Sequence, residues 1–109
     1  MTVASAKEFF SQRLPKKLQE KPEIVENINA VYKFILEGPG GSTWTVDLTT
    51  PGGKITEADL AAACTVTMAA TDFVDIVNGT SNAQMAFMSG KLKIAGDLGQ
   101  ALKLQNVLA

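Results

Sequence analysis

The chain has 109 residues, of which 46% are hydrophobic and 19% are charged, and its formal net charge is -1. This length fits one domain over residues 1–109, and the apolar content suffices for a hydrophobic core and is too high for a disordered chain. Because the 10 basic residues are balanced by 11 acidic ones and form no patch, we expect no nucleic-acid partner.

The first thirty residues favour helices. A helical pattern covers residues 4–14, with Phe10 and Leu14 four apart, and Pro15 is expected to stop or kink it. Pro22 can begin a second short helix through Asn27, because proline is tolerated at the first helical position.

The middle of the chain favours strands separated by turns. The run AVYKFIL at residues 30–36 is rich in β-branched and aromatic residues and ends at a GPGG turn. TWTVDL at residues 43–48 alternates, which places its apolar side chains on one sheet face and its polar side chains on the other. A turn at residues 51–53 precedes a short strand at residues 54–56, and CTVTM at residues 64–68 supplies a fourth strand.

Two short helices are predicted after the fourth strand. The first covers residues 72–77, with Thr71 as a plausible N-cap. Ser81 and Gln84 have the spacing of a capping box, which predicts a second short helix that stops at Gly90.

A last strand and a last helix complete the order. KLKIA at residues 91–95 directs Leu92 and Ile94 inward and both lysines outward. Asp97 and Gln100 repeat the capping spacing, so a final helix is expected from about Asp97. Together these elements predict an α+β domain with one sheet face covered by helices and the other exposed to water.

Patterns of catalytic and metal-binding residues are missing from the sequence. The chain has no histidine, which excludes Ser-His-Asp and Cys-His arrangements and the commonest metal ligand. Cys64 lies in a predicted strand without an activating cation, so it is interpreted as a buried structural thiol. Asp72 and Asp75 are interpreted as helix-dipole and solubility residues, and the glycines form no phosphate-binding loop. We therefore expect no enzymatic activity, no metal and no cofactor.

The sequence also carries no targeting or membrane-spanning pattern. Charged residues interrupt the N-terminal stretch where a signal peptide needs an apolar run, and the last residues are not a peroxisomal signal. No window approaches the roughly 20 apolar residues needed to span a bilayer. A cytoplasmic location is expected.

A group of methionines and phenylalanines permits two interpretations. Met68, Met85 and Met88, with Phe73 and Phe87, fit an ordinary core. Methionines also form an adaptable lining for ligands of variable shape. Composition alone favours the core and leaves the lining open.

The final helix carries a broad apolar stripe. At about 100° per residue, five apolar residues share one side of it: Leu98, Ala101, Leu102, Leu104 and Leu108. Gln105 falls inside this stripe. Because a buried amide without a partner costs about 1–3 kcal/mol, Gln105 must bond to backbone, meet water or contact the polar head of a ligand.

Three segments resemble the sterol carrier protein 2 family, also called the SCP-2 sterol transfer domain. They are NAVYKFILEGPGGSTWTVDL at residues 29–48, CTVTMAATDFVDIVNG at residues 64–79 and AFMSGKLKIAGDLGQALKLQN at residues 86–106. They occur in the family's order and spacing, and the resemblance covers essentially the whole chain. It implies a five-stranded mixed, mostly antiparallel sheet with about five helices covering one face. It also implies a hydrophobic tunnel between sheet and helices, closed beneath the C-terminal helix.

The resemblance further implies a function and a site. Family members bind sterols, fatty acids, fatty acyl-CoA and phospholipids and promote lipid transfer in vitro, so the chain is expected to be a non-enzymatic lipid carrier. Carried over position by position, the tunnel lining includes Phe34, Trp44, Val46, Phe73, Ile76, Val77, Met85, Phe87, Met88, Leu98, Leu102 and Gln105.

The expected partner is therefore a lipid or another apolar small molecule. We expect a monomer that makes transient contact with a membrane surface. The alternative is a structural or interaction module of a larger lipid-metabolic assembly, in which the cavity is filled by the protein's own side chains.

Overall fold

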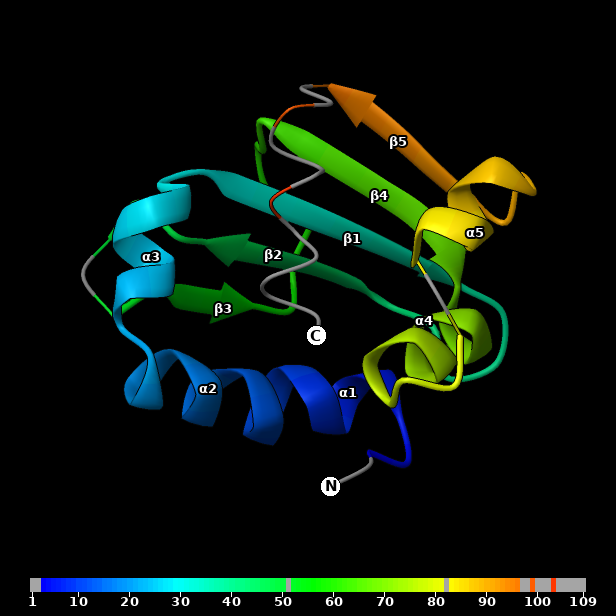
Figure 1. Cartoon of the computed structure of the whole chain (residues 1–109), viewed down its shortest axis with the longest axis horizontal. Helices are drawn as coiled ribbons and strands as arrows, with labels where there is room; N and C mark the ends of the chain where they lie inside the picture. Colours follow the sequence, from blue (N-terminus) through cyan, green and yellow to red (C-terminus); the bar gives the residue numbers. More distant parts are fainter. Residues whose placement is uncertain (1–2, 51, 82, 97–98, 100–102, 104–109) are drawn as a thin grey trace.

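A five-stranded mixed sheet forms the centre of the fold, and helices frame it (Figure 1). The computed structural model describes residues 3–50, 52–81, 83–96, 99 and 103. The strand order is β3-β2-β1-β4-β5, and every neighbouring pair is antiparallel except β1 and β4, which run parallel. The strands are β1 Val31–Glu37, β2 Thr43–Asp47, β3 Lys54–Thr56, β4 Cys64–Ala69 and β5 Leu92–Gly96. All five strands are confirmed to within one residue at each end, and with them the α+β class.

The N-terminal helix runs further than predicted. It consists of α1 Ala6–Glu8, a π-helical stretch η1 Phe9–Arg13 and α2 Leu14–Glu20. Ser5 begins it, because the Ser5 hydroxyl oxygen accepts a hydrogen bond from the Glu8 N–H at 3.2 Å. Of the two outcomes expected at Pro15, a stop or a kink, the stop is wrong, because α2 continues to Glu20. The Leu14 N–H bonds to the Phe9 carbonyl, five residues back, and this wider turn fits the proline, which has no N–H and would crowd a regular helix.

Three further helices follow in the predicted order, namely α3 Glu23–Ile28, α4 Ala70–Val77 and α5 Ala83–Met88. Helix α4 begins two residues earlier than expected, so Thr71 is not its N-cap. The strand β4 passes directly into it at Ala69, whose backbone is extended and which makes no side-chain capping bond. Asn29 ends α3 with a left-handed backbone, φ 47°.

The predicted capping box of Ser81 and Gln84 stays a prediction, because the residue directly before Ala83, where α5 begins, is not described. The final helix predicted from about Asp97 is described only at Gly99 and Lys103, both of which are helical. Apart from Gly99 and Lys103, the described residues form four helical segments, where about five were expected.

The helices bury one face of the sheet, which we call the inner face. Alternate strand residues point to it, and the register aligns them in rows across neighbouring strands. One row consists of Trp44, Phe34, Val66 and Ile94. In Figure 1 the N-terminal helix lies along the bottom of the sheet, α3 at the left and α4 at the right. The core of the protein is the space between these helices and the inner face.

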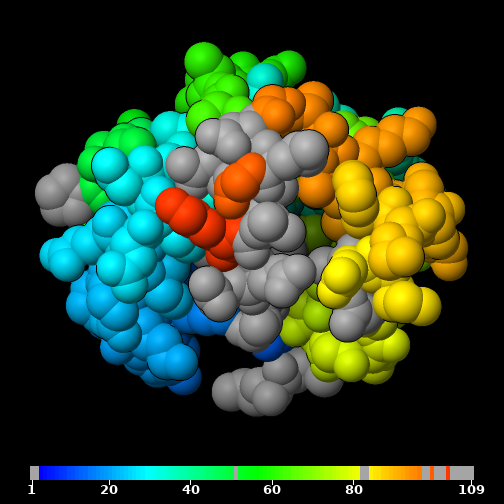
Figure 2. All heavy atoms as spheres, turned by 45° about the horizontal axis from the view of Figure 1, so that its top comes forward, coloured from blue at the N-terminus to red at the C-terminus, as the bar shows by residue number. Residues whose placement is uncertain are grey.

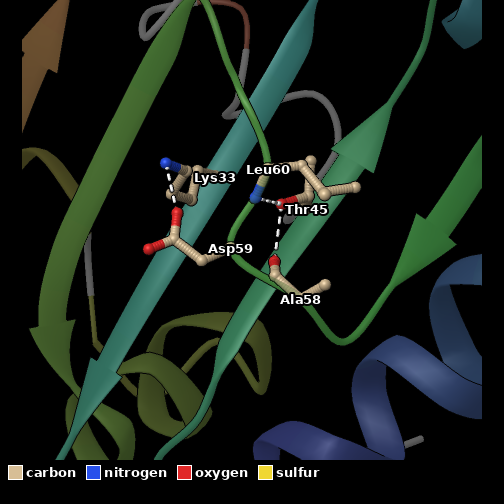
Figure 3. Close-up of polar contacts among 5 residues, drawn as sticks. All are labelled: Lys33, Thr45, Ala58, Asp59 and Leu60. Carbon is tan, nitrogen blue, oxygen red and sulfur yellow. Dashed lines mark hydrogen bonds and ion pairs between the residues drawn. The ribbon is translucent and has the colours of Figure 1, made fainter.

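The other face of the sheet is partly covered, which corrects the expectation that it is open to water. The connection between β3 and β4, residues 57–63, crosses it because β4 pairs with β1, two strands away from β3. The hydroxyl of Thr45 donates a hydrogen bond to the Ala58 carbonyl oxygen at 2.8 Å and accepts one from the Leu60 N–H at 3.2 Å (Figure 3). Thr45 is buried as a result.

A second contact holds the same crossing segment. The Lys33 Nζ atom on β1 lies 2.6 Å from Oδ1 of Asp59, as Figure 3 shows. The Asp59 side chain is 71% exposed, and ion pairs of this kind contribute at most about 1 kcal/mol. The buried hydroxyl of Thr45 therefore holds the segment more firmly than the ion pair does.

Candidate functional site

Five aromatic side chains form a buried cluster on the inner face of the sheet. Phe9 and Phe10 come from η1, Phe34 from β1, Trp44 from β2 and Phe73 from α4, and all five are buried. Phe10 stacks on Trp44 with ring centres 4.9 Å apart and on Phe73 at 5.3 Å. Phe9 meets Phe73 edge-on at 5.4 Å. The helices and the sheet are thus joined by one continuous aromatic contact.

The sequence places these rings together by simple periodicity. Phe34 and Trp44 are directly paired in the antiparallel β1–β2 register, so both project to the inner face. Phe73 faces them from the buried side of α4, with Ile76 and Val77 one turn further along the same side. Six of the residues predicted to line a site are therefore buried together: Phe34, Trp44, Val46, Phe73, Ile76 and Val77.

The three predicted lining residues of α5 do not join this cluster. Met85 is 67% exposed, Phe87 46% and Met88 75%, whereas Ala86 between them is buried. The remaining predicted lining residues, Leu98, Leu102 and Gln105, lie outside the described residues. The role of all six in ligand contact stays a prediction.

Two hydrogen-bond donors in this region lack an acceptor. Among the described residues, neither the indole Nε1 of Trp44 nor Nη1 of Arg13 has a hydrogen-bond partner, and both atoms are buried. The guanidinium carbon of Arg13 lies 5.9 Å from the centre of the Phe9 ring. A buried donor without a partner costs about 1–3 kcal/mol, so both atoms would gain from an acceptor supplied by a ligand.

The N-terminal helix adds positive charge beside these donors. Arg13, Lys17 and Lys21 are four apart, so they share one side of the helix. Burial lowers the pKa of the Lys17 ammonium, and repulsion from Lys21 and Arg13 lowers it further. An anionic group placed near this side of the helix would relieve that repulsion.

Sequence reasoning missed Phe9, Phe10 and Arg13 as site residues. The sequence pattern assigns Phe10 only to a helical stripe with Leu14. The signal that could have identified it is the pair of adjacent aromatic residues. Both side chains are buried, so the N-terminal helix turns a broad apolar side toward the sheet at η1.

The described residues contain no cluster of three or more His, Cys, Asp or Glu side chains able to hold a metal ion. Cys64 is fully buried on β4, as expected for a structural thiol. None of the described helices is both long and apolar enough to cross a bilayer.

Comparison with known proteins assigns this architecture to a family. The model of the SCP-2 sterol transfer family matches residues 10–109. Sterol carrier protein 2 of Gallus gallus is 46% identical over 101 residues, which cover 88% of this chain and 18% of the relative. The chain thus matches less than a fifth of that much longer protein.

Solved structures agree with the sequence comparison. The apo form of Sterol Carrier Protein 2 from Yarrowia lipolytica superimposes with a TM-score of 0.73 and 28% identity, covering 86% of this chain and 77% of that one. The Aedes aegypti Sterol Carrier Protein-2, solved in complex with palmitate, has a TM-score of 0.63 and 25% identity, covering 91% of this chain and 96% of that one.

Proposed function

The chain belongs to the SCP-2 sterol transfer family, and from that premise we propose that it is a non-enzymatic carrier of lipids. The observation that carries this proposal is the aromatic cluster on the inner face together with two buried donors that lack an acceptor. An apolar surface with a few placed polar groups is what a site for an amphiphile requires.

The apolar part of the site supports a cargo with a long hydrocarbon body. Each methylene moved out of water contributes about 0.8 kcal/mol before the cost of ordering the ligand. This attraction has no direction, so we propose that the protein accepts fatty acids, fatty acyl-CoA, sterols and phospholipids rather than one lipid. The palmitate complex of the Aedes aegypti relative supports the inclusion of fatty acids.

The polar part supports a cargo with a hydrogen-bond acceptor at one end. Arg13 and Trp44 each offer a buried N–H without a partner in the described part of the chain, and the neighbouring lysines favour a negative group. We propose that a carboxylate, ester or hydroxyl of the lipid is bound there, and that the buried lining residues of the inner face contact the hydrocarbon. Contact from Met85, Phe87, Met88, Leu98, Leu102 and Gln105 is part of the same proposal.

Trp44 is the only tryptophan in the chain and lies in the proposed site, so its fluorescence can test the proposal. A fatty acid brominated along its chain should quench the Trp44 emission saturably, and unlabelled palmitate should reverse the quenching. Native mass spectrometry of protein purified from lipid-rich cells should show co-purifying lipid. If quenching and co-purifying lipid are both absent, the carrier function is contradicted. That result would favour the alternative, an interaction module whose interior is filled by its own side chains.

A double variant controls for lipid that merely adsorbs to the surface. Trp44→Phe combined with Leu60→Trp moves the reporter to the crossing segment on the opposite face, where Leu60 is 48% exposed. The brominated fatty acid should no longer quench it, while displacement of a fluorescent fatty acid still reports binding. Equal quenching in both proteins would contradict a site on the inner face.

The remaining expectations are part of the proposal. The absence of histidine argues against hydrolytic chemistry in this chain. A monomeric state is testable by analytical ultracentrifugation, and a cytoplasmic location by imaging of a fluorescent fusion.

A further inference from the structure

Phe10 lies at the centre of the aromatic cluster. Its ring centre is 5.2 Å from that of Phe9 and 5.3 Å from that of Phe34. It also stacks on Trp44 at 4.9 Å and on Phe73 at 5.3 Å, with the paired ring planes 15° and 14° apart. Phe10 is buried and contacts each of the other four rings.

The position of the Phe10 ring coincides with the place of the proposed hydrocarbon. Phe34, Trp44 and Phe73 belong to the buried lining of the inner face, and Phe10 packs against all three from the N-terminal helix. A lipid chain that contacts these three side chains from between the sheet and the helices needs the space that the Phe10 ring fills. Protein interiors are close-packed, so the ring and the chain cannot both occupy that space.

The buried donors without an acceptor lie near the same ring. Phe10 stacks on the indole of Trp44, and Arg13 belongs to the same π-helical stretch as Phe10. The Phe10 ring has no oxygen atom that could accept a hydrogen bond from Trp44 Nε1 or Arg13 Nη1, whose partners are missing among the described residues. A lipid that replaces the ring can bring an oxygen to both donors.

The backbone that carries Phe10 has two hydrogen-bond arrangements within reach. The Leu14 N–H donates to the Phe9 carbonyl, five residues back. In this wider pattern the donor for the Phe10 carbonyl would be Pro15, which has no N–H. Transfer of the Leu14 N–H to the Phe10 carbonyl, four residues back, would form a regular helical turn and keep the number of hydrogen bonds unchanged. Single π-helical turns of this kind are frequent at functional sites.

The chain on both sides of η1 is held in place. Before it, Asn78 at the end of α4 binds both backbone groups of Val3: Oδ1 accepts from the Val3 N–H at 2.7 Å, and Nδ2 donates to the Val3 carbonyl at 2.9 Å. After it, α2 packs through the buried Leu18. Figure 2 shows α2 at the lower left of one face of the molecule and α4 and α5 at the right. A rearrangement between these fixed parts is therefore confined to η1.

We propose that the Phe10 ring fills the hydrocarbon site of the lipid-free protein and is displaced by the lipid, so that Phe10 sets the affinity of the site. The lipid chain takes the place of the ring on Trp44 and Phe73, the ring turns toward solvent, and the Leu14 N–H transfers to the Phe10 carbonyl. This inference rests on the proposed carrier function and names the residue that regulates the same site. An interior filled by its own side chains and a lipid-loaded interior are then two states of one protein.

Fluorine NMR tests the displacement in the wild-type protein. The chain contains five phenylalanines, and para-fluorophenylalanine gives each of them a resonance. The variant Phe10→Leu identifies the Phe10 resonance by its loss, and Phe87, which is 46% exposed, supplies the reference for a solvent-exposed ring. Saturation with palmitate should make the Phe10 resonance sensitive to the exchange of water for deuterium oxide. A Phe10 resonance that stays insensitive while palmitate is bound would overturn the proposal.

Removal of the ring tests the cost of displacing it. Phe10→Ala should bind palmitate at least about tenfold more tightly than the wild type, because the lipid no longer replaces a buried aromatic side chain. Phe10→Leu keeps an apolar side chain and should gain less, and it carries the comparison if Phe10→Ala does not fold. Phe9→Ala is the matched control, since Phe9 is as buried as Phe10 in the same stretch, and it should gain nothing. Unchanged or weaker binding by both Phe10 variants would contradict the displacement.

Toluene distinguishes a displaced ring from a ring that only supports the fold. An apolar cavity left by a deleted side chain binds small aromatic molecules, so toluene should raise the thermal stability of Phe10→Ala. If the ring and the lipid occupy one place, toluene should also compete with palmitate for Phe10→Ala, and it should not compete for Phe9→Ala. Stabilisation of Phe10→Ala by toluene without any competition would overturn the proposal.

Palmitate uptake keeps this proposal apart from the carrier function. Uptake by the wild type, with an unchanged Phe10 resonance and no competition from toluene, would overturn the displacement and leave the carrier function intact. Uptake by Phe10→Ala alone would support the shared place and contradict the carrier function. Absence of uptake in the wild type and in all variants would contradict the carrier function, and the displacement with it.

Discussion

Arg13→Met should lower the affinity for palmitate about tenfold and the affinity for methyl palmitate by less, because the ester carbonyl can accept the same hydrogen bond but carries no charge. Nη1 of Arg13 is buried without an acceptor in the described part of the chain. A hydrogen bond to a charged group contributes about 1.5–3 kcal/mol. The rest of the Arg13 side chain is only half-buried, which favours the lower end of that range, and about 1.4 kcal/mol corresponds to a factor of ten. Methionine keeps the apolar stem and removes only the charge and the donors.

Trp44→Phe should have the complementary effect. The indole N–H is neutral, so its hydrogen bond contributes about 0.5–1.5 kcal/mol whether the acceptor is an acid or an ester. Both ligands should therefore bind up to about tenfold more weakly. The phenyl ring keeps much of the stacking on Phe10.

Isothermal titration calorimetry with palmitate, methyl palmitate and hexadecane measures these differences, with Lys16→Met as the control. Lys16 lies on the same helix, and its side chain is 66% exposed, so its loss should not distinguish the acid from the ester. An equal loss for all three ligands in Arg13→Met would show that the guanidinium only packs the site. Unchanged affinity for palmitate would refute the assignment of Arg13 to the lipid head.

Two further predictions concern the sheet. Thr45→Val should lower the free energy of unfolding by about 1–2 kcal/mol, because the Ala58 carbonyl and the Leu60 N–H each lose their hydrogen-bond partner. Thr45→Ser keeps the hydroxyl and should recover most of this loss. Urea titrations measure both variants. Hydrogen bonds from the Thr49 hydroxyl and N–H lower the pKa of the Asp47 carboxyl. This stabilisation is complete above the ordinary pKa of 3.8 and is lost as the pH falls through the lowered value. Asp47→Asn should therefore show a smaller loss of stability in acid, and an equally steep loss would contradict the assignment.

The strands could be predicted because their signal is local. In β2 and β4 the alternation of apolar and polar residues has the period of a strand, and glycine-rich turns mark the ends of β1 and β2. That alternation places Trp44 and Val46 on one face of the sheet, whereas Phe34 was expected there only from the family resemblance, and the β1–β2 register pairs it with Trp44.

The helical half was harder to predict because it depends on tertiary contacts. Proline usually ends a helix, yet the N-terminal helix continues through Pro15 because η1 widens the turn before it. The same stretch brings both Phe9 and Phe10 to the core, so the buried side of the helix is broader there than the stripe of Phe10 and Leu14 indicates. The unpartnered N–H groups of Arg13 and Trp44 could not be foreseen either, since they depend on which acceptors the folded chain places nearby.

The segment that covers Thr45, residues 57–63, was also hard to predict because its position depends on tertiary structure. The pattern of β2 predicts that Thr45 lies on the face opposite Trp44, and it does. What covers that face depends on the strand order, because only a parallel β1–β4 pair requires the chain to cross β2 and β1. Periodicity assigns residues to a face and says nothing about what passes over it.

Helix α5 is a second element for which periodicity does not show which side is buried, and three of its neighbouring residues were predicted to line the site. The spacing of Met85 and Met88 places them on one side of the helix, and their apolar character suggests that this side faces inward. The preference of apolar residues for the interior works in one direction only, since much of any protein surface is apolar as well. The residue of α5 that is buried is Ala86, whose carbonyl oxygen accepts a hydrogen bond from the Lys91 N–H beside β5. The inward side of α5 therefore carries the small Ala86, and the larger side chains of Met85, Phe87 and Met88 are exposed.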